Sequence, residues 1–130
     1  MELRSGNIVL RPLRLTDAKR LAELANNEKI SRNLRDAFPH PYSLEDAERF
    51  LANFTDQHPV TFFGIDYNGV YVGNIALVPG QDIYRKSAEI GYFIGEPYWN
   101  KGITSKAVNL ITEYGFTHLD IIRIHTGVFE

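Results

Sequence analysis

Apolar and polar residues alternate with the period of a strand over 60–67 and 70–78. The two runs are joined by Asn68-Gly69, which is typical of a two-residue hairpin turn because both residues tolerate a left-handed backbone. A third run, 87–94, predicts another strand, whose successive side chains point to opposite faces. One face would carry Ala88, Ile90, Tyr92 and Ile94, and the other Glu89, Gly91 and Phe93.

Three other segments carry apolar residues at helical spacing. We expect the first helix to open at Thr16-Asp17, with the hydroxyl as its cap, and to end at Asn26-Asn27. Ser43 is expected to cap a second helix, which continues to Phe54, because the acidic Asp46 follows three positions later. The third helix is predicted from an apolar stripe made of Ile103, Ala107, Leu110, Ile111 and Tyr114.

The remaining segments complete the predicted order of elements. Residues 8–12 form a short strand-like run, 30–34 a short helical turn, and 38–41 an extended loop that its prolines enforce. Residues 121–129 form a strongly apolar strand. The predicted order is therefore β-α-α-β-β-β-α-β, a mixed α/β or α+β fold with a mostly antiparallel sheet. The last strand would lie parallel to 87–94 across the crossover helix.

Composition places the chain among soluble globular domains. It has 130 residues, of which 44% are hydrophobic and 23% charged, and no cysteine. No apolar run reaches the roughly 18–20 residues that span a bilayer, and residues 1–6 lack the apolar stretch of a signal peptide. We therefore expect a single cytoplasmic domain over 1–130, with no membrane contact.

The charges narrow the classes of partner. The formal net charge is −2, so the chain as a whole has no electrostatic attraction to nucleic acid or an anionic membrane. Residues 1–38 carry eight Lys/Arg against five Asp/Glu, and this excess fits either a solvated surface or contact with an anionic ligand. Four scattered histidines and no cysteine predict no metal site.

The segment most suited to chemistry is 96–107, which reads EPYWNKGITSKA and joins the strand 87–94 to the third helix. Unpaired N–H groups at a helix start can hold phosphate, and Gly102 allows a close approach of the backbone. Lys101 and Lys106 would add positive charge. On these residues alone, a plain helix start remains the simpler interpretation, since neither a Walker loop nor a Gly-x-Gly-x-x-Gly fingerprint is present.

Together with its surroundings, this segment resembles the coenzyme A pyrophosphate loop of the GNAT acetyltransferase superfamily. It is most similar to the branch of ribosomal-protein N-terminal acetyltransferases (the RimJ/RimL type), which has Ala-Glu-Ile-Gly-Tyr and then Tyr-Trp-Gly-Lys-Gly-x-Ala-Thr-Glu-Ala. Here 88–92 reads AEIGY and 98–107 reads YWNKGITSKA. Segments 10–13, 41–47 and 72–75 resemble that branch as well, so the resemblance covers essentially the whole chain.

Three positions depart from the pattern of that branch. Thr104 stands where Gly or Ala is usual, Lys106 replaces a Glu, and Asn100 replaces a small residue. The lysine makes the helix start more positive, which favours an anion. We expect cofactor binding to survive these changes, although a weakly held cofactor fits them too.

The resemblance implies a GNAT-like acyl-CoA N-acyltransferase fold with acetyl-CoA between the strands 87–94 and 121–129. Its pantetheine arm would pair, as an added strand does, with the backbone of Tyr92, Phe93 and Ile94. The pyrophosphate would meet N–H groups of the loop and helix start, namely Asn100, Lys101, Gly102, Ile103, Thr104 and Ser105. No metal is implied.

The implied reaction is direct attack of an amine on the thioester, as in an acetyl-CoA-dependent N-acetyltransferase. Glu89 is the candidate base, directly or through water, and a solvated surface carboxylate is an equally open interpretation. A backbone N–H near Phe93 would stabilise the developing oxyanion. By analogy the acceptor would meet Arg32, Asn33, Phe38 and Tyr42, for which packing or ordinary solvation is the simpler interpretation.

The acceptor stays open at this point: a protein N-terminus, which the resemblance favours, a lysine, a polyamine, an aminoglycoside or a small amino acid. A CoA-binding or degenerate module without turnover is the alternative to an enzyme. Members of the family continue past the equivalent of 121–129 into a helix and two strands. We therefore expect a C-terminally truncated domain that lacks roughly 35–45 residues. A second copy of the chain, in a homo-oligomer, would cover the exposed 121–129 edge, or the isolated chain would be prone to aggregate.

Overall fold

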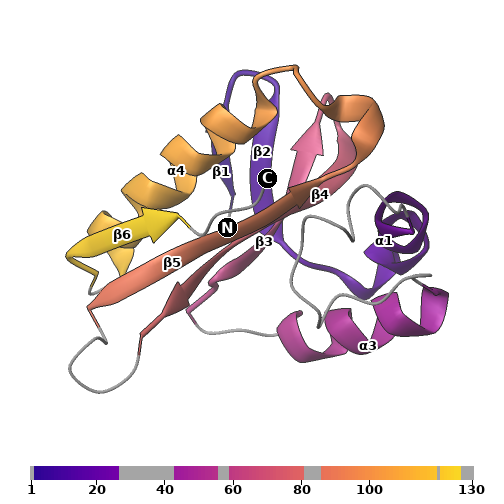
Figure 1. Ribbon diagram of the computed structural model, residues 1–130, viewed down its shortest axis with the longest axis horizontal. Coiled ribbons are helices and arrows are strands. Elements are labelled where there is room, and N and C mark those ends of the chain that lie inside the picture. The colour runs from indigo at the N-terminus through magenta and orange to yellow at the C-terminus, as the bar shows by residue number, and fades with distance from the viewer. Residues whose placement is uncertain (1, 27–42, 56–58, 81–85, 120, 127–130) are drawn as a thin grey trace.

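The central sheet of the molecule is mixed, with antiparallel pairing from β1 to β5 and a parallel pair β5–β6 (Figure 1). The computed structural model describes residues 2–26, 43–55, 59–80, 86–119 and 121–126. Its strands are β1 (Leu3–Ser5), β2 (Ile8–Pro12), β3 (Phe62–Tyr67), β4 (Val70–Pro79), β5 (Ser87–Ile94) and β6 (Arg123–Thr126). Its helices are η1 (Leu15–Asp17), α1 (Ala18–Ala25), α3 (Leu44–Phe54), η3 (Glu96–Tyr98) and α4 (Ile103–His118).

The predicted mixed α/β fold and the order of its main elements are confirmed. Asn68 and Gly69 adopt φ values of 53° and 82°, the left-handed pair that the hairpin prediction requires. Strand β1 was not predicted, because three residues before a Gly-Asn turn give too short a pattern. The described part of the last strand is Arg123–Thr126, whereas the prediction began at 121. Predicted elements within 27–42 and the predicted strand's end at 127–129 lie outside the described residues.

Helices cover both faces of the sheet (Figure 1). On one face α4 packs its buried Ile103, Ala107 and Ile111 against strand residues such as Leu77 and Ile90. On the other face α1 and α3 enclose a second core around Leu21, Leu51, Tyr71 and Phe93. We call these the α4 face and the α1/α3 face. The alternation predicted for 87–94 is confirmed, since Ala88, Ile90 and Ile94 are buried on the α4 face and Phe93 on the α1/α3 face.

Strand β4 contains a bulge that changes which side chains face the helices. Ile65 pairs with Gly73 and the next residue, Asp66, with Tyr71, so Val72 is an extra residue in β4. The bulge directs Tyr71 to the α1/α3 face and Val72 to the α4 face. A Cβ on Gly73 would stand 2.1 Å from the Phe93 carbonyl oxygen. The close approach of β4 and β5 therefore requires glycine at this position.

Arg11 anchors the α1/α3 face through a buried ionic network. Its guanidinium donates to Asp17 at 2.8 and 2.9 Å, to Asp66 at 3.1 Å twice, and to the Pro12 carbonyl at 3.1 Å. The Arg11 and Asp17 side chains are only 4% and 8% exposed. Burial lowers the pKa of Arg11, but hydrogen bonds and charges from the two carboxylates outweigh it and raise the pKa above its ordinary value.

Of the two predicted helix caps, Ser43 of α3 is confirmed and Thr16 of α1 is not. Ser43 caps α3 as expected: its hydroxyl accepts from the Asp46 N–H at 3.1 Å, and the Asp46 carboxylate accepts from the Ser43 N–H at 3.0 Å. The Ser43 backbone and hydroxyl hydrogen bonds lower the pKa of Asp46. The expected Thr16 cap is wrong. The helix is preceded by η1, and Asp17 accepts from the Arg14 N–H while it binds Arg11.

Within the described ranges, no helix is long and apolar enough to cross a membrane. The helical segments instead bury one face each against the sheet.

Replacing Arg11 with methionine tests the ionic network. Arg11→Met should lower the free energy of unfolding by about 3–5 kcal/mol, because it leaves two carboxylates buried without their cation. Arg4→Met is the matched control, since the Arg4–Glu2 pair is exposed and should contribute at most about 1 kcal/mol. Urea denaturation measures both. Equal losses in the two variants would contradict the role given to Arg11.

Candidate functional site

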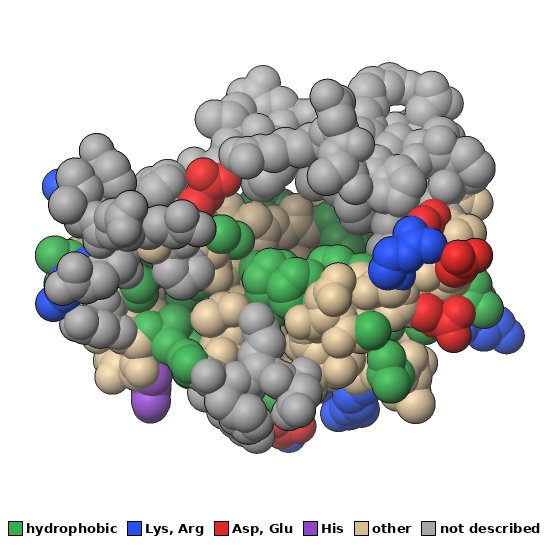
Figure 2. Space-filling view, turned by 90° about the horizontal axis from the view of Figure 1, so that it is seen from below, with side chains coloured by type: hydrophobic (Ala, Val, Ile, Leu, Met, Phe, Trp, Pro, Cys, Tyr) green, Lys and Arg blue, Asp and Glu red, His purple; other side chains and the backbone are tan. Residues whose placement is uncertain are grey.

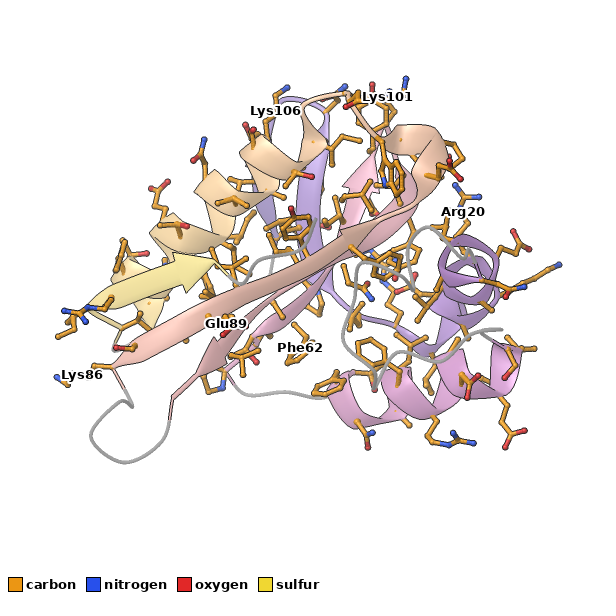
Figure 3. The ribbon with its side chains drawn as sticks, viewed as in Figure 1. Arg20, Phe62, Lys86, Glu89, Lys101 and Lys106 are labelled. Carbon is orange, nitrogen blue, oxygen red and sulfur yellow. The ribbon has the colours of Figure 1, made fainter. Side chains whose placement is uncertain are left out.

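The start of α4 presents backbone N–H groups and positive charge at one end of the molecule. Asn100 and Gly102 have φ values of 63° and 75°, and no side chain caps the helix. The first N–H groups of a helix have no partner within it, so they can donate hydrogen bonds to an anion. Lys101 and Lys106 are exposed and lie at this end (Figure 3). The Lys106 ammonium lies 3.8 Å from the point where a Cβ on Gly6 would stand.

Two side-chain contacts hold the segment that leads into α4. Arg20 of α1 donates to the Tyr98 hydroxyl at 2.6 Å and to the Tyr71 carbonyl at 3.0 Å, so it joins η3 to β4. The Trp99 indole N–H donates to the Ile94 carbonyl at 2.7 Å. A Cβ on Gly95 would stand 2.4 Å from Leu24, so α1 also packs closely on this segment. The loop position is thus set by α1 as much as by β5.

The β4–β5 ladder decides which backbone groups of β5 face the side of β6. Gly80 N–H donates to Ser87 O and Gly95 N–H to Val72 O, and the register between these bonds has no shift. Antiparallel strands exchange bonds at every second pair, so Phe93 directs its N–H and C=O at β4. The N–H and C=O groups of Tyr92 and Ile94 point away from β4. The N–H near Phe93 that suits an oxyanion is therefore that of Tyr92 or Ile94.

The described pairing of β6 with β5 covers part of the length of β5. Their described pairing runs from Ser87–Arg123 to Ile90–Thr126, and β5 extends beyond it to Ile94. The outward N–H and C=O groups of Tyr92 and the N–H of Ile94 lie in that extension. An extended chain carrying amides could pair with them as an added strand does. The Ile94 carbonyl is occupied by Trp99 and would mark the end of such pairing.

The α1/α3 face of the same strands forms the other wall of the candidate site. Cross-strand pairs place Phe62, Ala76 and Gly91 in one row and Val78 and Glu89 in the next. A Cβ on Gly91 would meet nothing within 4 Å. Glu89 and Phe62 both lie on this side of the sheet (Figure 3). Figure 2 shows hydrophobic side chains gathered in a hollow on the face seen from below.

Aromatic rings of α3 and β3 pack together on this side of the sheet. Phe54 stacks on Phe62 with ring centroids 3.9 Å apart, and Phe50 contacts both rings at 5.0 and 6.2 Å. These rings are half-buried rather than sealed in the core. A ligand over Gly91 would therefore meet apolar surface on one side and the Glu89 carboxylate on the other.

The structure groups the predicted residues in two sets. Asn100 to Ser105 lie together at the α4 start, although the Ile103 side chain is buried and can offer only its N–H. Tyr92 to Ile94 and Glu89 lie along β5. The predicted acceptor residues Arg32, Asn33, Phe38 and Tyr42 lie outside the described residues. No group of three His, Asp or Glu that could hold a metal occurs in the part of the chain described.

Sequence reasoning missed three polar residues of this region. Arg20, Tyr71 and Asn74 were not singled out, although Asn74 was within a quoted motif. The available signal was an amide in the middle of an otherwise apolar strand, since Asn74 is 7% exposed. Its side-chain oxygen accepts from the Tyr71 hydroxyl. Tyr71 itself packs beside the Arg11 guanidinium, 5.6 Å from the ring centroid.

Comparison with known proteins gives the context of this geometry. The model of the "Acetyltransferase (GNAT) domain" family matches residues 7–130. Spermidine N(1)-acetyltransferase of Escherichia coli K12 is 28% identical over 121 residues, which make up 92% of this chain and 62% of that protein. The chain thus spans less than two thirds of the length of this curated relative.

Solved structures share the fold. The RimL ribosomal L7/L12 alpha-N-protein acetyltransferase in complex with coenzyme A superposes with a TM-score of 0.81 at 19% identity, over 95% of this chain and 72% of that chain. The microcin C7 self immunity acetyltransferase MccE in complex with acetyl-CoA and AMP gives 0.71 at 27% identity, over 92% and 68%.

Two glycines on neighbouring strands test this geometry. Gly91→Ala should leave the free energy of unfolding within about 0.5 kcal/mol of the parent, because its Cβ enters open space. Gly73→Ala should cost about 3 kcal/mol, because its Cβ collides with the Phe93 carbonyl. Chemical denaturation distinguishes the two. A strongly destabilised Gly91→Ala would mean that the space over Gly91 is filled.

Proposed function

The chain belongs to the acetyltransferase (GNAT) domain family, and on that basis we propose that it transfers an acetyl group from acetyl-CoA to a primary amine. The observation that carries the proposal is that two features follow one another along the chain: the end of β5 and the start of α4. An uncapped helix start with two exposed lysines stands directly after a strand whose outward amides extend past its described pairing with β6. The diphosphate of acetyl-CoA would match the α4 start, and the amide-containing arm that follows it would match the end of β5.

The α4 start fits the diphosphate of the cofactor. Its free N–H groups and the left-handed Gly102 allow close approach of the phosphate oxygens. Lys101 and Lys106 would add charge from either side. Lys106 stands where the branch usually has Glu, so this chain offers more positive charge there than the pattern of the branch.

The stretch of β5 beyond its described pairing with β6 fits the pantetheine arm. Tyr92 and Ile94 offer the backbone groups that point to the β6 side, and Trp99 ends the run by taking the Ile94 carbonyl. The thioester would then lie near Tyr92, just beyond the described pairing of β5 with β6. An N–H of Tyr92 or Ile94 would stabilise the negative charge that develops on the thioester oxygen.

The amine would approach from the α1/α3 face, over Gly91. Its nitrogen lone pair forms a bond to the acetyl carbon, the carbon–sulfur bond breaks, and the sulfur leaves with the bonding electrons as a thiolate. The proton that the amine gives up would pass to Glu89, directly or through water. Glu89 is half-buried two residues from Gly91 on the same face, and it is the described carboxylate nearest to that position along β5.

A protein α-amino group is the acceptor we propose, on the resemblance to the ribosomal-protein branch. Its ordinary pKa near 8 leaves a usable neutral fraction at physiological pH, so modest base assistance suffices. A lysine side chain, with a pKa near 10.4, would need more help than one half-exposed carboxylate offers.

Acetyl-CoA binding is the first test. Acetyl-CoA should raise the melting temperature, since a ligand at about 100 times its Kd stabilises the native state by about 2.7 kcal/mol. Trp99 is the single tryptophan and bonds Ile94, so its fluorescence should change on binding. Lys106→Ala should weaken binding about fivefold, whereas Lys19→Ala, an exposed α1 lysine, should not. No thermal shift together with no CoA release from a panel of amines would refute the acetyltransferase proposal. Binding without release would leave a CoA-binding module.

Glu89→Gln tests the proposed base. Turnover should fall mainly at low pH, where most of the amine is protonated and needs a proton acceptor, while the Kd for acetyl-CoA stays unchanged. A pH–rate profile against the parent measures the effect. Unchanged rates across the whole pH range would exclude Glu89 as the base.

A further inference from the structure

Asn74 is a polar residue on the floor of the acceptor face that the proposed reaction does not yet use. It pairs with Phe93 across the β4–β5 ladder and with Gly64 across β3–β4, and its side chain lies on the α1/α3 face with Tyr71. Neighbouring buried positions of β4, such as Ile75 and Leu77, are apolar. An amide that is 93% buried in such a strand needs hydrogen-bond partners.

The Asn74 side chain has a partner on one of its two atoms. Its oxygen accepts from the Tyr71 hydroxyl, which leaves the Nδ2 group as the donor end. In the described part of the chain, no buried side-chain nitrogen or oxygen lacks a partner. Because no hydrogen bond from Nδ2 is seen among the described residues, we infer that this group is accessible from the α1/α3 face, on which the side chain lies. A surface-reaching donor on a nearly buried side chain is placed to meet a ligand.

Tyr71 fixes which end of the amide faces outward. Its ring packs against the buried Arg11 guanidinium, and its backbone carbonyl accepts from Arg20. Gly64 leaves the space for this packing, because a Cβ there would stand 3.0 Å from Arg11 and 3.3 Å from Tyr71. Rotation of the Asn74 amide would therefore break its hydrogen bond with the Tyr71 hydroxyl, because the packed Tyr71 ring cannot move with it. The donor is preorganised.

The position of Asn74 relative to Gly91 gives the distance to the reacting amine. Gly91 pairs with Ala76, and Asn74 is the next residue of β4 on the same face. Such diagonal neighbours are about 7–8 Å apart, and the Asn side chain spans part of that gap. An oxygen two or three bonds from an amine held over Gly91 would lie within hydrogen-bond reach of Nδ2.

We propose that Asn74 is a specificity-determining residue of the acceptor site, whose Nδ2 group donates to a carbonyl or hydroxyl oxygen next to the reacting amine. Tyr71 is the positioning residue that orients it. This inference rests on the proposed function. Such a site favours amines with an adjacent oxygen, such as an α-amino amide, over alkylamines and polyamines without one. When one of these other amines binds, the Nδ2 group loses its water and gains no hydrogen bond in return.

The test compares alaninamide with sec-butylamine, in which an ethyl group replaces the carboxamide, at equal concentrations of neutral amine. The full-length parent should prefer alaninamide in kcat/KM. Asn74→Ala should lower kcat/KM about tenfold for alaninamide and less than twofold for sec-butylamine, with the Kd for acetyl-CoA unchanged. Asn109→Ala, an exposed position of α4 on the other side of the sheet, serves as the matched control.

A second variant keeps the proposal testable should Asn74→Ala fold poorly. Tyr71→Phe leaves Asn74 in place and removes the hydroxyl that orients it, so the preference for alaninamide should fall by about threefold. A merely structural role for Tyr71 would lower both activities equally and leave their ratio unchanged. Equal kcat/KM for both amines in the parent, or a parallel loss in the variants, would overturn the role of Asn74 while acetyl transfer stands. Absence of transfer to every amine would refute the proposed function itself.

Discussion

The buried pairing of Arg11 with Asp17 and Asp66 is the constraint on which the α1/α3 side of the molecule depends. A guanidinium inside a sheet is tolerable only if its donors are all used, and here each carboxylate binds it twice. Asp17 belongs to the turn before α1, and Asp66 to β3. The network therefore fixes where the chain leaves β2, and with it how α1 lies over β4 and holds the loop before α4.

The ladder between β4 and β5 separates the two functions proposed for one strand. Its alternation directs the amides of Tyr92 and Ile94 to the side of β6, while the side chains of Glu89 and Phe93 face the α1/α3 side. A cofactor arm can thus bind along the edge while an acceptor lies on the face. Gly91, between the two, has no side chain to separate them.

The sequence predicts most of this fold, because strong local signals specify it. Asn68-Gly69, Ser43 with Asp46, and the alternation of 87–94 each act over a few residues. Long-range partners are invisible to such patterns: nothing around Thr16 indicates that Asp17 will bind Arg11 instead of following a hydroxyl cap. The loop at the α4 start was predictable through its motif. Asn74 was not, because the meaning of a buried amide depends on Tyr71, and the bulge at Val72 decides where Tyr71 points.

Arg11 and Asn74 are buried polar residues in otherwise apolar strands, and their hydrogen-bond partners distinguish their roles. Arg11 is surrounded by acceptors from this chain and has no donor left for a ligand. Asn74 accepts one bond from Tyr71, and its Nδ2 group is the donor that we propose for a ligand. Polar residues that violate a strand pattern are expected where function demands them or where other residues compensate fully. Arg11 meets the second condition. Asn74 meets only the first condition, that function demands the polar residue. Arg11 packs on the Tyr71 ring, and Tyr71 orients Asn74, so the residue with the structural role supports the one with the proposed functional role.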